Sequence, residues 1–158
     1  MLSRQPNSTH CFICGMENPV GLHLIFEEVQ TGEVVAHCVV EEKYQGYPGI
    51  VHGGIVAAML DEVSGRAWMG SGANPRFMYT ARLNVRYRKH VPINQPLRLV
   101  GKAGQDRGRI ATAYAAIYDQ QGQILAECES LLIDVPVEDY QGVDLESLGW
   151  KVYPEECL

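Results

Sequence analysis

The sequence has no apolar run near the roughly 18 residues that a membrane-spanning helix needs. Residues 1–10 also contain no apolar stretch of the signal-peptide type. Charged side chains are few, at 20%, and leave a formal net charge of −6, which disfavours nucleic acid and anionic membranes as partners. We therefore expect a cytoplasmic protein with no nucleic-acid partner and no membrane partner.

The even set of cysteines that a disulfide framework requires is missing as well. The chain has 5 cysteines, which fits reduced thiols in a reducing compartment. Cys11 and Cys14 have the C-x-x-C spacing of half a zinc site, with His10 and His23 nearby. A structural zinc site usually takes four protein ligands, and no second pair stands at a suitable spacing. Packed cysteines are therefore the favoured interpretation and zinc the alternative, so we expect no metal and no cofactor.

Several catalytic motifs are absent. The chain lacks the Gly-x-Ser-x-Gly elbow of α/β-hydrolases, the P-loop, and the glycine pattern of dinucleotide-binding proteins. Cys38 and Cys128 lie in strand-like patterns, so we expect them to be core residues rather than nucleophiles. The catalytic candidates that remain are side chains and backbone amides outside those motifs.

The chain has 158 residues, of which 46% are hydrophobic, and this length is typical of a single domain. Apolar residues recur at helical spacing from about Gly53 to Met69, which predicts one long helix. Alternating apolar and polar residues predict two strands before the helix, as a hairpin, and four after it, as a meander. The expected strands cover residues 21–27, 34–40, 80–87, 97–103, 109–118 and 123–133.

This order predicts an α+β fold in which one antiparallel sheet of about six strands packs on a single helix. We expect a single domain with its core at about residues 20–134. A C-x-x-C segment precedes that core at residues 1–19, and an acidic, irregular tail follows at residues 135–158. Because one helix covers only part of such a sheet, the uncovered strand edges and face predict a partner subunit.

The helix face opposite the apolar stripe has an unusual composition. It presents Ala57, Asp61, Ser64 and Trp68 where a helix facing only water would carry Lys and Glu. Close packing against a second subunit or a ligand explains that composition. Asp61 would then be a partly desolvated carboxylate that acts as base or nucleophile, and an ordinary surface acid is the alternative. Glu62 points nearer the edge of the stripe.

His52, Gly53 and Gly54 stand at the start of the predicted helix. A helix N-terminus has unsatisfied N–H groups and partial positive charge, and glycine lets a ligand oxygen approach them, as in an oxyanion site. The alternative is a tight loop in which His52 caps the helix or packs. Gly53 and Asp61 lie eight residues apart, about 12 Å along a helix, so a site that uses both is shared between subunits.

Basic residues gather in one stretch of the chain. Residues 66–109 hold ten of the 13 Lys and Arg residues and a single acid, a net charge of +9, while the rest of the chain carries −15. A stretch of this kind is suited to binding an anion. Solvated strand faces paired to the acidic remainder are the alternative.

Several of these segments together resemble a known family. Residues 49–56, Gly-Ile-Val-His-Gly-Gly-Ile-Val, followed by Asp61, resemble the hotdog-fold acyl-CoA thioesterases, specifically their phenylacetate-pathway-type (PaaI-like) branch. Residues 11–22 look like the start of many members of this superfamily, and residues 80–87 resemble its first strand after the helix. The resemblance covers about residues 11–133.

The resemblance implies a helix wrapped by a curved antiparallel sheet, in dimers and often tetramers. In such enzymes the amide at the position of Gly53 polarises the thioester carbonyl, and the acid at the position of Asp61, from the partner subunit, attacks directly or activates water. His52 matches a residue placed beside the thioester, and Glu62 adjoins Asp61 and could share its role. The implied activity is hydrolysis of acyl-CoA to free acid and CoA. A non-catalytic acyl-CoA or lipid-ligand binding module on the same fold is the alternative.

Coenzyme A is a specific candidate anion for the basic stretch, because its phosphates suit cationic side chains at the mouth of a cleft. The expected substrate contacts are Gly54 and Glu62 on the helix, and basic residues near strand ends or turns: Arg88, Lys89, Arg107 and Arg109. The acyl group, the carrier (CoA or an acyl carrier protein) and the choice between dimer and tetramer do not follow from the sequence.

Overall fold

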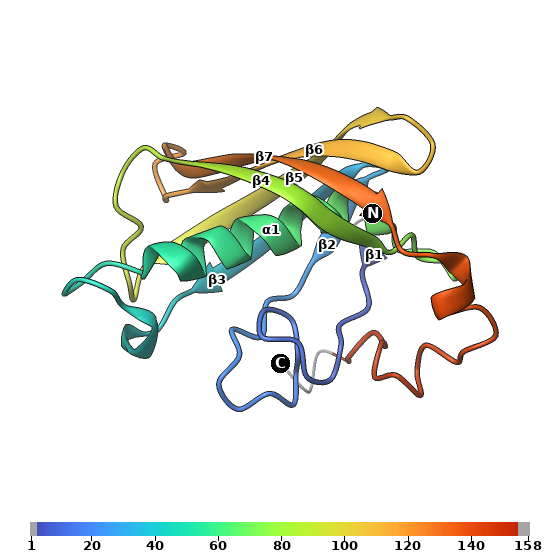
Figure 1. The fold of residues 1–158 in the computed structure, drawn as a ribbon. Coiled ribbons are helices and arrows are strands. Elements are labelled where there is room, and N and C mark those ends of the chain that lie inside the picture. The colour runs from blue at the N-terminus through green and yellow to red at the C-terminus, as the bar shows by residue number, and fades with distance from the viewer. Residues whose placement is uncertain (1–2, 155–158) are drawn as a thin grey trace.

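The computed structural model describes residues 3–154 (Figure 1). Its central element is the helix α1, Gly53–Met69, with the bounds that the apolar spacing predicts. Seven antiparallel strands form one sheet in the order β1-β2-β3-β5-β6-β7-β4, where about six were expected. The sheet curves over one side of α1, as expected for a hotdog fold (Figure 1). The elements are β1 Ser3–Arg4, β2 Glu27–Gln30, β3 Glu33–Val39, the 3-10 helix η1 Glu42–Tyr44, β4 Met78–Tyr87, β5 Pro96–Asp106, β6 Ile110–Tyr118, β7 Ile124–Asp134 and the 3-10 helix η2 Val137–Asp139.

The apolar stripe of α1 is buried. Its members recur at helical spacing and form the centre of the core together with side chains from the sheet: Val56, Met59, Leu60, Val63 and Ala67. The helix backbone approaches β5 at Gly101, where a Cβ would lie 2.1 Å from the carbonyl oxygen of Val63. Only glycine fits at that position, so this residue of β5 sets how near the helix comes to the sheet.

The strands β2 and β3 pair as the predicted hairpin, with Gly32 in their turn at a φ of 80°. Its first strand is shorter than expected, because β2 takes in only the last residue of the predicted strand at 21–27. The prediction for the rest of that segment was wrong. The backbone N–H groups of Leu22 and Leu24 bond to the carbonyls of Phe12 and Ile13 instead of to a strand. A distant part of the chain therefore overrides the local alternation.

The four strands after α1 do not form one continuous meander. β5, β6 and β7 follow one another, but β4 pairs with β7, from Met78 opposite Asp134 to Tyr87 opposite Ala126. The place beside β5 is taken by β3, which pairs with it over seven residues. Within the described chain β4 is thus an edge strand, and most of its side chains are exposed. Such an edge presents unpaired backbone groups.

Two irregular segments, residues 5–26 and 135–154, lie on the side of α1 away from the sheet (Figure 1). Ile13 and Cys14 from the first segment join the hydrophobic core, and Trp150 from the second packs against it. The C-x-x-C segment and part of the acidic tail therefore contribute to packing. Among residues 3–154 no helix is long and apolar enough to cross a membrane.

The predicted small-residue face of α1 needs one correction. Ser64 is fully buried, and Trp68 donates its indole N–H to the carbonyl of Thr112 on β6, 2.8 Å away. Both side chains belong to the inner side of the helix, because the sheet curves further around α1 than a flat sheet would. Ala57 and Asp61 are half-buried, as the composition of that face indicates.

Candidate active site

The N-terminus of α1 lies at the wall of an open hollow of about 640 Å³. His52 caps the helix: its Nδ1 accepts a hydrogen bond from the N–H of Gly54 at 3.0 Å. The N–H of Gly53 has no hydrogen-bond partner among residues 3–154. Gly53 is thus the amide available to an incoming oxygen, whereas Gly54 is held by the cap. His52 therefore caps the helix, as the alternative interpretation expected, and the N–H of Gly53 is nevertheless free within the described chain.

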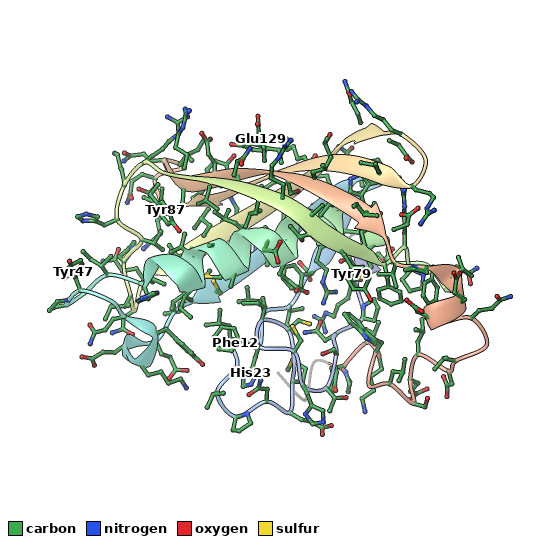
Figure 2. All side chains as sticks on the ribbon, viewed as in Figure 1. Phe12, His23, Tyr47, Tyr79, Tyr87 and Glu129 are labelled. Atoms are coloured by element: carbon green, nitrogen blue, oxygen red, sulfur yellow. The ribbon has the colours of Figure 1, made fainter. Side chains whose placement is uncertain are left out.

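Tyr87 borders the same hollow. It donates its hydroxyl to the carbonyl oxygen of Gly53 at 2.7 Å, and its ring lies about 3.7 Å from the place where a Cβ on Gly53 would be. Figure 2 shows Tyr47 and Tyr87 at the end of the molecule where α1 begins. Tyr87 has no predicted role, because a tyrosine at a strand end carries no motif signal.

Asp61 lies in the middle of α1 and lines a second hollow of about 430 Å³. Its Oδ1 accepts a hydrogen bond from the hydroxyl of Thr80 on β4 at 2.6 Å. The register of β4 shifts between Thr80 and Arg82, so Thr80 sits beside a bulge in the edge strand. Thr80 therefore orients one carboxylate oxygen and leaves the other for a reactant. Thr80 is not recognisable as a site residue from the sequence, since its partner lies 19 positions away on another element.

The C-terminal segment forms one wall of this second hollow. The ring of Phe77 lies between two aromatic rings, with centroids 5.5 Å from Tyr140 and 5.3 Å from Trp150. Figure 2 shows Tyr79, another lining residue, toward the end opposite Tyr87, beside this segment. The acidic tail, which lies outside the family pattern in the sequence, thus shapes the surroundings of Asp61.

The two hollows have no lining residue in common, and each holds only one of the two main candidates. Gly53 and Asp61 are about 12 Å apart along one helix. A single chain therefore does not bring the free amide and the carboxylate to one reacting carbon. A site that uses both residues would have to be shared between subunits, and this stays a prediction.

Glu62 has a partner that the sequence did not reveal. Its Oε1 accepts a hydrogen bond from Nε of Arg66 at 2.8 Å, and Arg66 is only 1% exposed. Arg66 also donates to the carbonyl of Pro6 at 2.6 Å and lies over the ring of Phe26. Arg66 belongs to the basic stretch at residues 66–109 of the sequence, but in the structure it is a core residue. Glu62 is engaged in a structural ion pair, and substrate binding by it stays a prediction.

The four basic candidates fall into two groups. Arg88 and Lys89 follow β4 near the start of α1, where Lys89 lines the first hollow. Arg107 and Arg109 lie at the β5–β6 turn, toward the opposite end of the sheet (Figure 1). One chain does not bring all four together.

Some members of the basic stretch are paired to acids, as the alternative interpretation expected. Arg88 bonds to Glu127 at 2.9 and 2.5 Å, and these bonds are the main reason why the pKa of Glu127 is lowered. Tyr114 donates to the same carboxylate, and Arg76 pairs with Asp134. Lys89 instead bonds to the neutral side chain of Gln123, which leaves its charge uncompensated by that contact.

Among residues 3–154, one group of side chains could hold a metal ion: Cys11, Cys14 and Glu62. Cys11 Sγ accepts hydrogen bonds from the N–H groups of Ile13 and Cys14 at 3.3 and 3.4 Å. The pKa of Cys11 is lowered to about 6, chiefly by a hydrogen bond from the Cys14 thiol, and the pKa of Cys14 is raised. The four described cysteines are free thiols, and Cys157 lies outside the described residues.

Comparisons with known proteins agree with this architecture. The family model of the thioesterase superfamily matches residues 48–126, which are 79 of the 158 residues. A thioesterase superfamily protein of known structure is 34% identical, with a TM-score of 0.71 over 78% of this chain. This chain spans only 63% of that protein's length. No curated protein matches the chain.

Two more distant structures contain CoA or a CoA ester. A hypothetical thioesterase from Streptococcus pneumoniae TIGR4, solved with coenzyme A, is 20% identical, with 70% of this chain and 84% of that chain covered and a TM-score of 0.63. The protein smu.793 from Streptococcus mutans UA159, bound to acetyl CoA, is 20% identical, with 71% and 88% covered and a TM-score of 0.64. At this identity the likeness shows a shared fold.

Proposed function

Because the chain belongs to the thioesterase superfamily, we propose that it hydrolyses acyl-CoA thioesters to a free acid and CoA. The observation that carries the proposal is the state of Asp61, a half-buried carboxylate at a hollow with one oxygen held by Thr80. A binding module has no need of an oriented carboxylate there, whereas a thioester hydrolase needs a base or a nucleophile. The CoA-bound structures of the same fold support the substrate class.

The free N–H of Gly53 supplies the electrophilic half of the site. It donates a hydrogen bond to the thioester carbonyl oxygen, and the partial positive charge of the helix N-terminus stabilises negative charge as it develops there. The hydroxyl of Tyr87 binds the Gly53 carbonyl and fixes the orientation of this peptide unit. His52, which caps the helix, lies beside the thioester.

Asp61 of the partner subunit supplies the other half. In direct attack its free oxygen bonds to the carbonyl carbon, the C–S bond breaks, and CoA leaves as a thiolate; water then hydrolyses the anhydride. In general-base catalysis Asp61 takes a proton from water, the hydroxide adds to the carbon, and the departing thiolate takes up a proton. Both routes use the same residue, and the proposal keeps both.

A homodimer completes the site, and a dimer of such dimers gives a tetramer. The exposed edge of β4, a strand of ten residues, offers its outward-facing N–H and C=O groups to a second copy of the chain, and β4 also carries Thr80 beside Asp61. Pairing there would place this edge and its helix face in one interface. Light scattering is expected to give a dimer or a tetramer. A strictly monomeric protein would leave Gly53 and Asp61 without a common target.

Coenzyme A would enter with its phosphates at basic side chains. Lys89 and Arg88 lie near the helix N-terminus, so they are suited to the subunit that polarises the carbonyl. Arg107 and Arg109 lie toward the other end of the sheet, so they would reach the same CoA only from the partner subunit. Gly54 and Glu62 remain proposed substrate contacts at the helix.

The further assignments belong to the same proposal. They are a single hotdog domain with its core at about residues 20–134, membership of the phenylacetate-pathway-type branch, and a cytoplasmic location. The central experiment measures thiol release by the purified protein over a panel of acyl-CoA esters. Turnover that is lost in Asp61→Asn supports the proposal. Tight binding of CoA esters with no turnover would instead establish the non-catalytic module.

A further inference from the structure

The C-x-x-C motif, which thioester hydrolysis does not use, meets a third chemically suitable side chain. Cys11 and Cys14 lie in the segment below α1, where Figure 2 marks Phe12, the residue that follows Cys11. Glu62 reaches them from the helix, so that its Oε2 is 3.9 Å from Cys11 Sγ. All three ligand atoms lie within 4.8 Å of one another. The sequence showed only two ligands because the third is 48 positions away from Cys14.

These separations suit a tetrahedral metal ion. With Zn–S near 2.3 Å and Zn–O near 2.0 Å, tetrahedral zinc holds two sulfur ligands about 3.8 Å apart and a sulfur and an oxygen about 3.5 Å apart. The observed limit of 4.8 Å means that shifts of about 1 Å, within reach of side-chain rotation, bring the donors to those distances.

The backbone around the cysteines is built to hold a thiolate. Two N–H groups, from Ile13 and Cys14, point at Cys11 Sγ. The turn closes through the N–H of Gly15, which donates to the carbonyl of Cys11 at 2.8 Å. A Cβ on Gly15 would lie 2.3 Å from that carbonyl oxygen, so only glycine permits the turn. Hydrogen bonds of this kind orient and tune a metal ligand.

Arg66 provides both orientation and charge balance. It holds Oε1 of Glu62 at 2.8 Å, which leaves Oε2 directed at the cysteines. Two thiolates and one carboxylate carry −3, and Arg66 contributes +1, so a divalent cation brings this partly buried group to neutrality. Arg66 Nη2 is buried and has no hydrogen-bond partner in the described chain, although buried donors are normally paired.

We propose that Cys11, Cys14 and Glu62 bind a thiophilic divalent cation, zinc first among them, with water in the fourth position. Two sulfurs, one carboxylate oxygen and one water make a four-coordinate set of the kind that zinc prefers. The ion ties the N-terminal segment to α1 at the residue next to Asp61. The proposal does not depend on the catalytic assignment, because it concerns binding and stability.

The wild-type protein provides the first test. Chelator-treated, reduced protein is loaded with zinc, desalted, and measured by plasma mass spectrometry, and the expected result is about one zinc ion per chain. Cobalt loading is expected to give the near-ultraviolet thiolate charge-transfer band and the visible bands of a tetrahedral site. Zinc is also expected to raise the unfolding temperature, since it binds the folded chain. Substoichiometric zinc with no cobalt bands would overturn the proposal.

Variants assign the ligands. Cys11→Ser is expected to abolish stoichiometric metal binding, and the matched control Cys38→Ser, another half-buried cysteine, is expected to retain it. Glu62→Gln is expected to keep the thiolate–cobalt band while the affinity falls at least about 10-fold. Equal zinc content in Cys11→Ser and Cys38→Ser contradicts the site, and unchanged affinity in Glu62→Gln removes the carboxylate from it. Because these measurements read metal content and spectra, failed catalysis does not affect them.

Discussion

Substitution of Asp61 by Asn is the sharpest test of the proposed chemistry. Asn has the shape of Asp and retains a carbonyl oxygen, so it can still accept the 2.6 Å hydrogen bond from the Thr80 hydroxyl. The hollow and the helix are therefore preserved, and what is lost is the charged oxygen that attacks or takes a proton. Loss of a positioned base or nucleophile costs at least about 10²-fold in kcat, or about 2.7 kcal/mol of transition-state stabilisation.

The comparison variant is Glu62→Gln, one residue further along α1. That side chain points about 100° away around the helix and is paired with the buried Arg66. Its substitution should cost much less in kcat but should lower the unfolding temperature, because it leaves Arg66 without its carboxylate. Asp61→Asn should show the opposite pattern, with a large loss of kcat and little change in stability.

The assay combines steady-state thiol release with thermal unfolding on the same preparations. It reports kcat, KM and the unfolding temperature for the wild type and both variants. The reasoning is refuted if Asp61→Asn retains wild-type kcat, whatever the stability of Glu62→Gln. A loss of kcat that is equal in the two variants would assign the chemistry to the pair rather than to Asp61.

Three other predictions follow from particular contacts. Charge reversal in Lys89→Glu should raise KM for acyl-CoA more than it lowers kcat, since the phosphates are remote from the reacting carbon. It should also weaken the salt dependence of binding. An unchanged KM would show that Lys89 is a solvated surface residue. Arg88 lowers the pKa of Glu127 below its ordinary 4.5, so this pair contributes stability that is present above pH 4.5 and lost as the pH falls through the lowered pKa. Denaturant unfolding at neutral and acidic pH should therefore show a weaker acid dependence for Glu127→Gln, and an identical dependence would show that the pair contributes nothing. Gly101→Ala should lower the free energy of unfolding by about 3 kcal/mol or more, because its Cβ would overlap the helix backbone. The control Gly72→Ala, which has open space around it, should change the free energy of unfolding by less than about 1 kcal/mol.

The candidate site shows where sequence analysis reaches its limit. His52, Gly53 and Asp61 could be proposed from the sequence because they lie at the start of one helix or on it, where spacing alone sets their relative positions. Thr80 and Arg66 were missed or misjudged, because their roles come from contacts with distant residues. The bond from Thr80 to Asp61 needs the β4 edge to pass beside α1, and the burial of Arg66 needs both irregular segments to close over the helix, where Pro6 and Trp150 contact it.

The sequence by itself determined the local elements. Apolar residues at 3.6-residue spacing set α1 to its observed bounds, and strict alternation placed five of the six expected strands to within a few residues. These patterns act between neighbours in the chain, so they can be read without knowing the fold. They also set Gly53 and Asp61 eight residues apart on one helix, about 12 Å along its axis.

Only the tertiary structure decided which elements meet. It put β3 rather than β4 beside β5, turned the first predicted strand into a packed loop, and brought Glu62 to the two cysteines. Each of these outcomes depends on competition for the same hydrogen bonds and the same buried volume by segments tens of residues apart. The free energy of the whole fold decides which segments pair and pack, and a local sequence pattern contains no information about that free energy.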